Sequence, residues 1–173
     1  IVSPKIEEQK DDAITEALKL VMEGADEFKK VDGMYEAYKD REMIGTIVIA
    51  KGQGYSSIIE TMVGVSLDGS ITGIKVLSQA ETPGLGTRIE EFKPGQDSPW
   101  FQKQFIGKKG EEVLLTKDGG EIDGITGATI SSRAVSNSVR DAVESCQDRE
   151  ITSDGTTQAS AEYDEETEAT NES

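Results

Sequence analysis

The sequence predicts a single α+β domain, with a mainly antiparallel sheet flanked by an N-terminal and a C-terminal helix. Three observations lead to this fold class. Apolar residues recur at helical spacing towards both ends, short β-branched segments lie between them, and the dipeptide Asp68-Gly69 separates two of those segments. Asp-Gly is favoured in tight hairpins, where both turn residues need positive φ. With 173 residues, the chain has room for one ordinary domain and a tail.

The first half of the chain predicts a helix followed by strands. Residues 6–31 carry apolar side chains at helical spacing among charged ones, namely Ile14, Leu18, Val21, Met22 and Phe28. Residues 44–50 are rich in β-branched side chains and predict a strand, which the glycine-containing residues 51–54 end. Residues 58–67 and 71–77 form the two arms of the predicted hairpin.

The second half predicts loops that lead into a final helix. Residues 81–98 are punctuated by Gly and Pro, and residues 99–105 predict a short helix with Ser98 as its N-cap. Residues 113–116 and 121–123 predict a second hairpin around the glycines of residues 117–120. Residues 129–147 predict the last helix, whose apolar stripe consists of Val135, Val139, Ala142, Val143 and Cys146.

These elements divide the chain into three parts. Residues 1–30 are expected to be an N-terminal helix and linker, residues 31–150 the folded domain, and residues 151–173 a disordered acidic tail. The tail has seven carboxylates and no Lys or Arg, so it lacks the apolar surface that would offset the entropy of ordering. No apolar stretch reaches the length of a membrane-spanning helix. Because the chain starts at Ile1 rather than Met, we expect that an upstream anchor has been removed.

The composition excludes several classes of function. A net charge of −16 disfavours nucleic-acid binding, because a phosphate backbone needs a basic surface. The chain has no His and a single Cys, which excludes His-dependent catalytic triads, iron–sulfur clusters and CxxCH haem sites and makes a zinc enzyme improbable. Any redox chemistry must therefore rely on an organic cofactor.

One segment, residues 123–132, carries the pattern of a phosphate site. It predicts a strand end, a turn of small residues and the first turn of a helix, where free amide groups attract anions. Hydroxyl groups and the guanidinium of Arg133 are expected to add donors, the hydroxyls being those of Thr126, Thr129, Ser131 and Ser132. Judged by helix chemistry alone, the simpler interpretation is that Thr126 or Thr129 only caps the helix.

The same segment resembles a known modification motif. The flavinylation motif Asp-x-x-Ser/Thr-Gly-Ala-Thr is matched by Asp123, Thr126, Gly127, Ala128 and Thr129. A second segment is similar to the signature loop of FMN-binding domains and consists of Glu81, Thr82, Pro83, Gly84, Leu85 and Gly86. Together, and in this order after Gly54-Tyr55, they resemble the FMN-binding domain family of the Rnf complex G subunits and, next, the C subunits of Na⁺-translocating NADH:quinone reductase. Without that resemblance, residues 81–86 would be taken for an ordinary surface turn.

The resemblance implies a covalent cofactor and a membrane complex. A flavin transferase would attach FMN through its phosphate to Thr129, and residues 81–86 would lie near the isoalloxazine ring. The chain would be an electron-transfer subunit of an ion-translocating ferredoxin:NAD oxidoreductase, without stand-alone catalysis and with the other subunits as its partners. It would be held to the cell membrane by a single-pass N-terminal anchor, on the extracytoplasmic side. One departure from the family pattern follows Gly54-Tyr55, where a glycine is common near Ser57 and this chain has Ser56-Ser57.

Two other functions remain open from the sequence. An FMN-binding sensory or regulatory domain could share the motif without relaying electrons. A non-redox extracytoplasmic binding module could use Thr126 and Thr129 only as helix caps. A dinucleotide site at residues 52–54 is rejected, because a strand-like segment rather than a helix follows these glycines.

Overall fold

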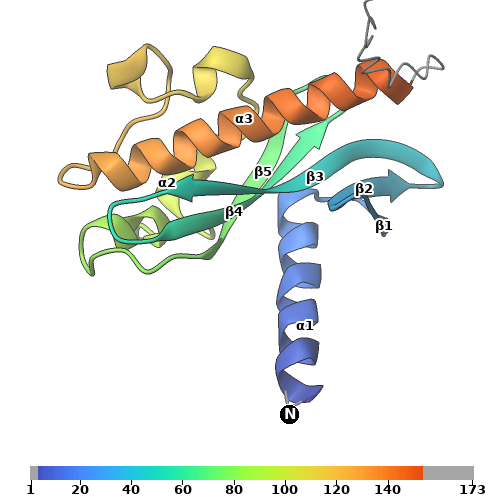
Figure 1. The fold of residues 1–173 in the computed structure, drawn as a ribbon, viewed down its shortest axis with the longest axis horizontal. Coiled ribbons are helices and arrows are strands. Elements are labelled where there is room, and N and C mark those ends of the chain that lie inside the picture. Colours follow the sequence, from blue (N-terminus) through green and yellow to red (C-terminus); the bar gives the residue numbers. More distant parts are fainter. Residues whose placement is uncertain (1–3, 154–173) are drawn as a thin grey trace, which may run out of the picture.

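The computed structural model describes residues 4–153, which form a five-stranded sheet with a helix against each face (Figure 1). Strands that follow one another in the chain are neighbours in the sheet, and every pair is antiparallel. The predicted fold class is therefore confirmed. The strands are β1 (Glu27–Val31), β2 (Met34–Lys39), β3 (Glu42–Gln53), β4 (Ile58–Ser66) and β5 (Ile71–Ser78).

The two helices pack on opposite faces because side chains alternate along the central strands. On β4, Val63 faces the core under α3 (Thr129–Ser153), while its neighbour Met62 faces the core under α1 (Pro4–Val21). The predicted stripe of α3 is buried throughout and lies in the larger core. Most of α3 runs along the sheet, so this helix covers most of its face of the sheet (Figure 1).

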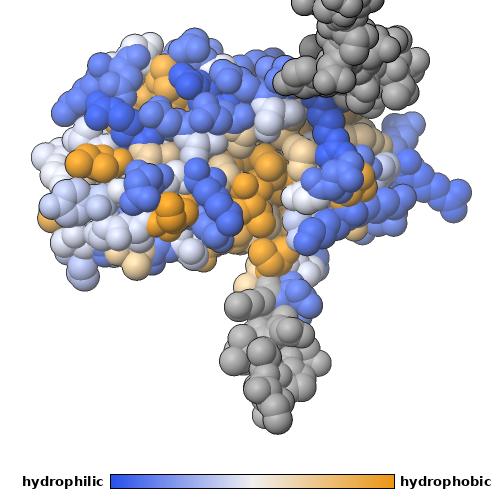
Figure 2. Space-filling view, in the orientation of Figure 1, coloured by the Kyte–Doolittle hydropathy of each residue, from blue (hydrophilic) through white to orange (hydrophobic). Residues whose placement is uncertain are grey.

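Helix α1 contacts the sheet through its last turns, and its N-terminal part extends away from the sheet (Figure 1). Ala17, Leu18, Val21 and the following Met22 are buried, whereas Leu20 is exposed. Gly64 permits the close approach, because a Cβ there would lie 2.5 Å from the carbonyl oxygen of Val21. Apolar residues show at the surface where α1 meets the sheet (Figure 2).

The prediction of a helix through residue 31 is wrong beyond Val21. Gly24 has φ +87°, which ends the helical conformation, and residues 27–31 become the edge strand β1, paired with β2. Phe28 was predicted on a helix face, but it packs from β1 against the core under α1. The helical spacing of one aromatic residue cannot distinguish these two states, because tertiary pairing decides them.

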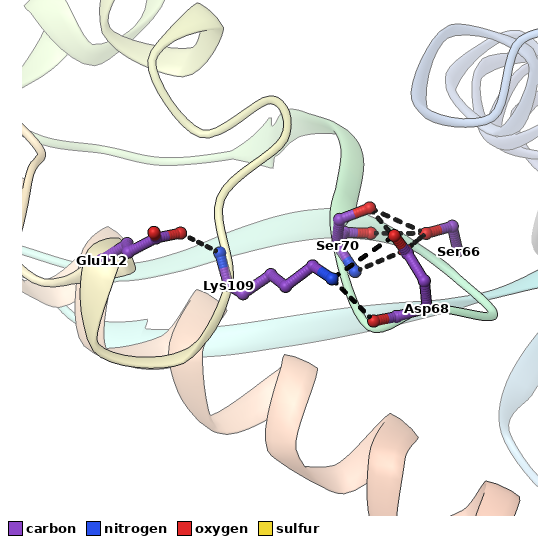
Figure 3. A network of polar contacts seen from close by, with 5 residues as sticks. All are labelled: Ser66, Asp68, Ser70, Lys109 and Glu112. Atoms are coloured by element: carbon purple, nitrogen blue, oxygen red, sulfur yellow. Dashed lines mark hydrogen bonds and ion pairs between the residues drawn. The ribbon is translucent and has the colours of Figure 1, made fainter.

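The predicted hairpin around Asp68-Gly69 is confirmed, and Lys109 ties its turn to a distant loop (Figure 3). The Asp68 carboxylate accepts hydrogen bonds from the hydroxyls of Ser66 and Ser70 and from the Ser70 amide at 3.0 Å. The ammonium of Lys109 lies 3.3 Å from Asp68 Oδ2. These contacts, that from Ser66 first, hold the pKa of Asp68 well below its usual range.

Three local predictions need correction. Strand β3 continues through Gln53, so Gly52 does not end it; a Cβ there would collide with the Ala134 carbonyl oxygen, which shows that this glycine serves close packing of α3. The short helix α2 (Trp100–Lys103) follows Pro99, and the hydroxyl of Ser98 contacts the Asp97 side chain instead of capping the helix. Gly86–Glu90, within the predicted loop, forms the 3₁₀ helix η1.

The second predicted hairpin is also wrong. Residues 110–123 form two 3₁₀ turns, η2 (Gly110–Val113) and η3 (Thr116–Asp118), with a single parallel bridge between Leu115 and Ile122. Gly119, at φ 94°, ends η3 in the left-handed conformation. The chain then reverses direction, and Ile122 pairs with Leu115 in parallel rather than in a hairpin.

The last helix is longer than predicted. It runs through Ser153, so residues 151–153 continue α3, and residues 154–173 of the predicted tail lie outside the described residues. Arg149 anchors this end to the β1–β2 turn, with Nη2 2.8 Å from Asp32 Oδ2. Within residues 4–153, none of the helices combines the length and apolar character needed to span a bilayer.

Candidate functional site

A cavity of about 600 Å³ opens where three segments meet: the loop after β3, the loop of residues 81–86, and the start of α3. These segments are far apart in the chain, and the antiparallel sheet brings them to one end of the molecule. Residues that line the cavity are Tyr55, Glu81, Thr82, Leu85, Gly86, Gly127, Ala128, Thr129, Ile130 and Ser131.

The cavity brings together most of the residues predicted from the two sequence segments. It does not include Asp123, Thr126, Ser132, Pro83 or Gly84 in its lining. Pro83 and Gly84 are exposed at the tip of their loop, where the Gly84 amide donates to the Thr87 hydroxyl at 3.0 Å. Thr126 is exposed in the turn before α3.

Asp123 supports the motif through its backbone. Its amide donates to Gln104 Oε1 at 2.8 Å, and its carbonyl oxygen accepts from Gln104 Nε2 at 3.1 Å. Gln104 follows α2, so this pair fixes the start of the motif against a separate part of the fold. The Asp123 side chain is exposed.

Thr129 is the first residue of α3 and lines the cavity. The Ser132 amide donates to the Ala128 carbonyl oxygen at 3.0 Å, which closes the first turn of the helix. Helix geometry leaves the earlier amides without intrahelical acceptors. The Thr129 hydroxyl thus belongs to a helix start that can stabilise an anion.

Two predicted donors are engaged within the protein. The Ser132 hydroxyl donates to the Ala128 carbonyl oxygen at 2.8 Å and accepts from the Ile125 amide at 3.0 Å, so it shapes the turn before Thr129. The Ser131 hydroxyl donates to the carboxylate of Glu81. Neither proton is directed to a ligand in this arrangement.

Arg133 also lies away from the cavity lining. Its Nε and Nη2 donate to the two carboxylate oxygens of Asp118, at 2.7 and 2.9 Å. These hydrogen bonds lower the pKa of Asp118 and hold the guanidinium on the side of η3. The expected cation beside the helix start is therefore used to fasten α3 to a neighbouring loop.

Glu81 is buried, with 5% of its surface exposed, and its carboxylate accepts hydrogen bonds from two other segments. The amides of Tyr55, Ser56 and Ser57 donate at 2.9, 3.1 and 2.9 Å, and the Ser57 hydroxyl donates at 2.8 Å. Burial raises the pKa of Glu81, but the hydrogen bonds, from Ser131 and Ser57 above all, outweigh it and lower the pKa below its ordinary value. Glu81 is therefore an ionised acceptor at neutral pH.

Large apolar side chains form the open part of the cavity wall. Tyr55, Leu85 and Ile130 are 72%, 44% and 52% exposed, which is high for residues of this size. Apolar residues interrupt the polar surface at the end of the molecule where α3 begins (Figure 2). Such a wall suits a flat aromatic ligand. The sequence did not predict that the side chains of Tyr55 and Ile130 line the site, because a single exposed apolar residue has no periodic signal.

The motif turn and the 81–86 loop touch each other at the cavity. Gly127 has φ +81°, and a Cβ there would lie 3.3 Å from Leu85 Cδ2. A side chain at this position would be strained and would press on the apolar wall. The positive φ therefore favours glycine at this position of the motif, and an added Cβ would also crowd the Leu85 side chain.

Comparison with known proteins identifies the family. The FMN-binding domain model matches residues 54–144, which include all three segments of the cavity. The G subunit of the proton-translocating ferredoxin:NAD(+) oxidoreductase complex of Clostridium ljungdahlii is 35% identical over 150 residues, covering 83% of this chain and 77% of that protein. The G subunit of the ion-translocating oxidoreductase complex of Methanosarcina acetivorans is 36% identical over 143 residues, covering 75% and 72%.

A solved structure is also similar. The C subunit of the Na⁺-translocating NADH-quinone reductase of Parabacteroides distasonis aligns with a TM-score of 0.49 and 23% identity, over 76% of this chain and 78% of that one. The assignment itself rests on the family match and on the two relatives in sequence. The chain therefore belongs to the FMN-binding domain family, as a relative of the G subunits of ion-translocating oxidoreductase complexes.

Proposed function

We propose that this chain is the FMN-carrying electron-transfer subunit of a membrane-bound ion-translocating oxidoreductase complex of the Rnf type, with FMN joined through its phosphate to the Thr129 hydroxyl. One observation carries the proposal. Thr129, at the start of α3, shares a single cavity with the exposed apolar side chains of Tyr55, Leu85 and Ile130. A phosphate attachment point and a surface for an aromatic ring are thus adjacent.

The residues present fit FMN in size and chemistry. A cavity of about 600 Å³ falls within the usual range of small-molecule sites. The start of α3 would stabilise the remaining negative charge of the phosphodiester by about 0.3–1 kcal/mol. Gly127 and Ala128 leave room for close approach of a ligand to the backbone beside Thr129.

Attachment requires one group transfer that flavin transferase would perform with FAD as the donor. The Thr129 oxygen would form a bond to the phosphorus of the FMN moiety, the bond between that phosphorus and the bridging oxygen of FAD would break, AMP would leave with that oxygen, and the hydroxyl proton would pass to solvent. No electrons are exchanged in this step. A permanent bond suits a carrier whose cavity is open to solvent, because the cofactor cannot dissociate between turnovers.

The bound flavin would supply the redox chemistry, and the chain would supply attachment, orientation and electrostatics. This division of labour agrees with the absence of His from the sequence, since no acid or base of that kind is needed. The wall formed by Tyr55, Leu85 and Ile130 would hold the ring while leaving one side accessible to a redox partner.

The proposal extends to the partners and the location. Electrons would pass between this FMN and the redox groups of neighbouring subunits, and the domain would lie on the extracytoplasmic side of the membrane. A single-pass anchor would precede α1, whose N-terminal part stands clear of the sheet (Figure 1). Both relatives are named as subunits of oxidoreductase complexes, which supports a multi-subunit setting.

Intact-mass measurement after co-expression with flavin transferase tests the attachment. We expect wild type and the matched control Thr116→Ala to carry a mass increment of one FMN, and Thr129→Ala to carry none. Thr116 is a suitable control because it is an exposed threonine outside both the motif and the cavity lining. An increment that persists in Thr129→Ala, or that peptide mapping assigns to Thr126 or Ser131, would contradict the assignment.

Electron transfer is tested in the assembled complex. We expect the flavin of this subunit to be reduced and reoxidised at the rate of electron flow through the complex, and Thr129→Ala to stop that flow. A flavin that stays in one redox state during steady turnover would instead indicate a sensory domain.

A further inference from the structure

The buried carboxylate of Glu81 stands out because it is the one charged group among the residues that line the cavity. Burying a carboxylate is costly unless hydrogen bonds compensate it. Here the compensation comes from donors on two segments that form different walls of the cavity, which are the loop of residues 54–57 and the first turn of α3.

The loop of residues 54–57 is shaped around this carboxylate. Three consecutive amides, those of Tyr55, Ser56 and Ser57, donate to its two oxygens, and the Ser57 hydroxyl adds a fourth bond. The Ser57 hydroxyl in turn accepts from the Ala80 amide at 2.9 Å. Tyr55, which is 72% exposed at the cavity, is thus held through its backbone rather than by packing of its ring.

The start of α3 is held by the same group. Ser131 is buried, and its hydroxyl donates to Glu81 Oε2 across a separation of 50 residues in the chain. Ser131 lies in the same helical turn as Thr129. The carboxylate therefore connects the apolar wall at Tyr55 with the helix turn that bears the threonine.

Two glycines leave the space that this arrangement needs. A Cβ on Gly54 would lie 2.5 Å from Glu81 Oε1, and a Cβ on Gly86 would lie 2.5 Å from Glu81 Cβ and 2.7 Å from Ser131 Oγ. Contacts this short cannot be relieved without moving the carboxylate. The loop at Gly54, the loop at Gly86 and the first turn of α3 therefore pack tightly around Glu81.

We propose that Glu81 is a positioning residue, whose carboxylate fixes the Tyr55 loop and the first turn of α3 relative to each other as the two walls of the cofactor cavity. Glutamine cannot replace it, because an amide has one acceptor oxygen, and its NH₂ group would face donors. The hydrogen bonds that Glu81 makes to both walls are present in the protein without its cofactor. That they position a flavin rests on the proposed function.

Amide hydrogen exchange in the flavin-free protein tests the tie. In Glu81→Gln, we expect the amides of Tyr55, Ser56 and Ser57 to exchange about tenfold faster or more, because glutamine offers them one neutral oxygen and turns its NH₂ group towards the remaining donors. We expect the Ser132 amide to exchange faster as well. In Ser131→Ala, only the Ser132 amide should exchange faster, because the amides of residues 55–57 still donate to the Glu81 carboxylate.

A matched control separates this effect from general destabilisation. Glu112→Gln removes another carboxylate that accepts a backbone hydrogen bond, from the Lys109 amide at 2.9 Å, outside the cavity lining (Figure 3). It should leave residues 55–57 and 132 unchanged. Exchange that rises evenly through β3 and β4 in Glu81→Gln, or that stays at the wild-type rate, would overturn the proposal.

The flavinylated protein provides a second readout. We expect Glu81→Gln to lower the visible circular dichroism of the flavin towards that of free FMN, while Glu112→Gln keeps the wild-type spectrum. An unchanged flavin spectrum in Glu81→Gln would contradict the positioning role. If Thr129 proved not to be the attachment site, the exchange pattern would still hold, so the two proposals can fail separately.

Discussion

At the scale of the residue, the cavity depends on positions where even a methyl group is too large. Gly86 is the sharpest case, because a Cβ there meets both Glu81 and Ser131. Neither neighbour is the free end of a flexible side chain, since Ser131 and Glu81 are both buried and bonded to each other. The glycine in this loop is therefore a packing requirement as well as a turn residue.

We expect Gly86→Ala to lower the free energy of unfolding by about 1–3 kcal/mol through overpacking, and to reduce FMN attachment. Gly124→Ala is the matched control, because its added Cβ would find nothing nearer than 3.6 Å. Its effect should stay within about 0.5 kcal/mol. Urea unfolding of both variants measures the difference, and equal stabilities would show that the loop can yield at Gly86.

Glu81 also predicts a pH dependence. Its pKa in the folded protein lies below the ordinary value of 4.5, so ionised Glu81 stabilises the fold above that pH, and this contribution is lost as the pH falls through the lowered folded pKa. The difference in unfolding free energy between wild type and Glu81→Gln should therefore be largest near neutral pH and should shrink as the pH falls below the ordinary value of 4.5. Urea titrations at a series of pH values measure it. A difference that does not vary with pH would contradict this account.

At the scale of the element, α1 and α3 hold the sheet in different ways. Helix α3 lies along the sheet and covers the larger core, whereas α1 contributes its last turns to the smaller one (Figure 1). The glycines at 52 and 64 let both helices approach the strands at backbone distance. The start of α3, which carries Thr129, is positioned by the long packing of the rest of that helix.

Adjacent residues at the end of α1 test this packing. Val21 is fully buried, while Leu20 is 62% exposed. We expect Val21→Asp to cost about 3–5 kcal/mol, because it places an uncompensated charge in the core. Leu20→Asp should change the free energy of unfolding by no more than about 0.5 kcal/mol. Chemical denaturation measures the free energy of unfolding of both variants. Similar losses would contradict the assignment of Val21 to the buried face of α1 and Leu20 to its exposed face.

At the scale of the whole molecule, charge is the dominant feature. The chain carries a net charge of −16, and like charges repel one another in the compact state. Both cores and the cavity lie within residues 4–153, whereas residues 154–173 contribute seven carboxylates and no Lys or Arg.

We expect a chain that ends at Ser153 to keep full FMN attachment and to lose part of the salt dependence of its melting temperature. The full chain should gain thermal stability as salt rises to about 0.15 M, because screening weakens the repulsion, and the shortened chain should gain less. Melting curves at several salt concentrations, with intact masses, provide the measurement. Loss of FMN attachment on shortening would mean that the tail takes part in maturation.

Local chemistry was enough to predict part of this structure. The Asp68-Gly69 turn and the apolar stripe of α3 follow from periods and motifs within short windows. Where local signals were ambiguous, the prediction was wrong, as for the strand at residues 27–31 and the second hairpin, which residues 110–123 do not form. Strand pairing decided the first, and the left-handed Gly119 helped decide the second.

The sequence by itself determined the fold class, the family resemblance and Thr129 as the candidate attachment residue, because each is recorded in neighbouring residues. Only the tertiary structure decided that Ser131 donates a hydrogen bond to Glu81 and that Arg133 donates to Asp118. It also decided that Tyr55 and Ile130 line the cavity. The physical reason is that a donor finds its acceptor through space. Ser131 and Glu81 are 50 residues apart in the chain, and no local pattern records their contact.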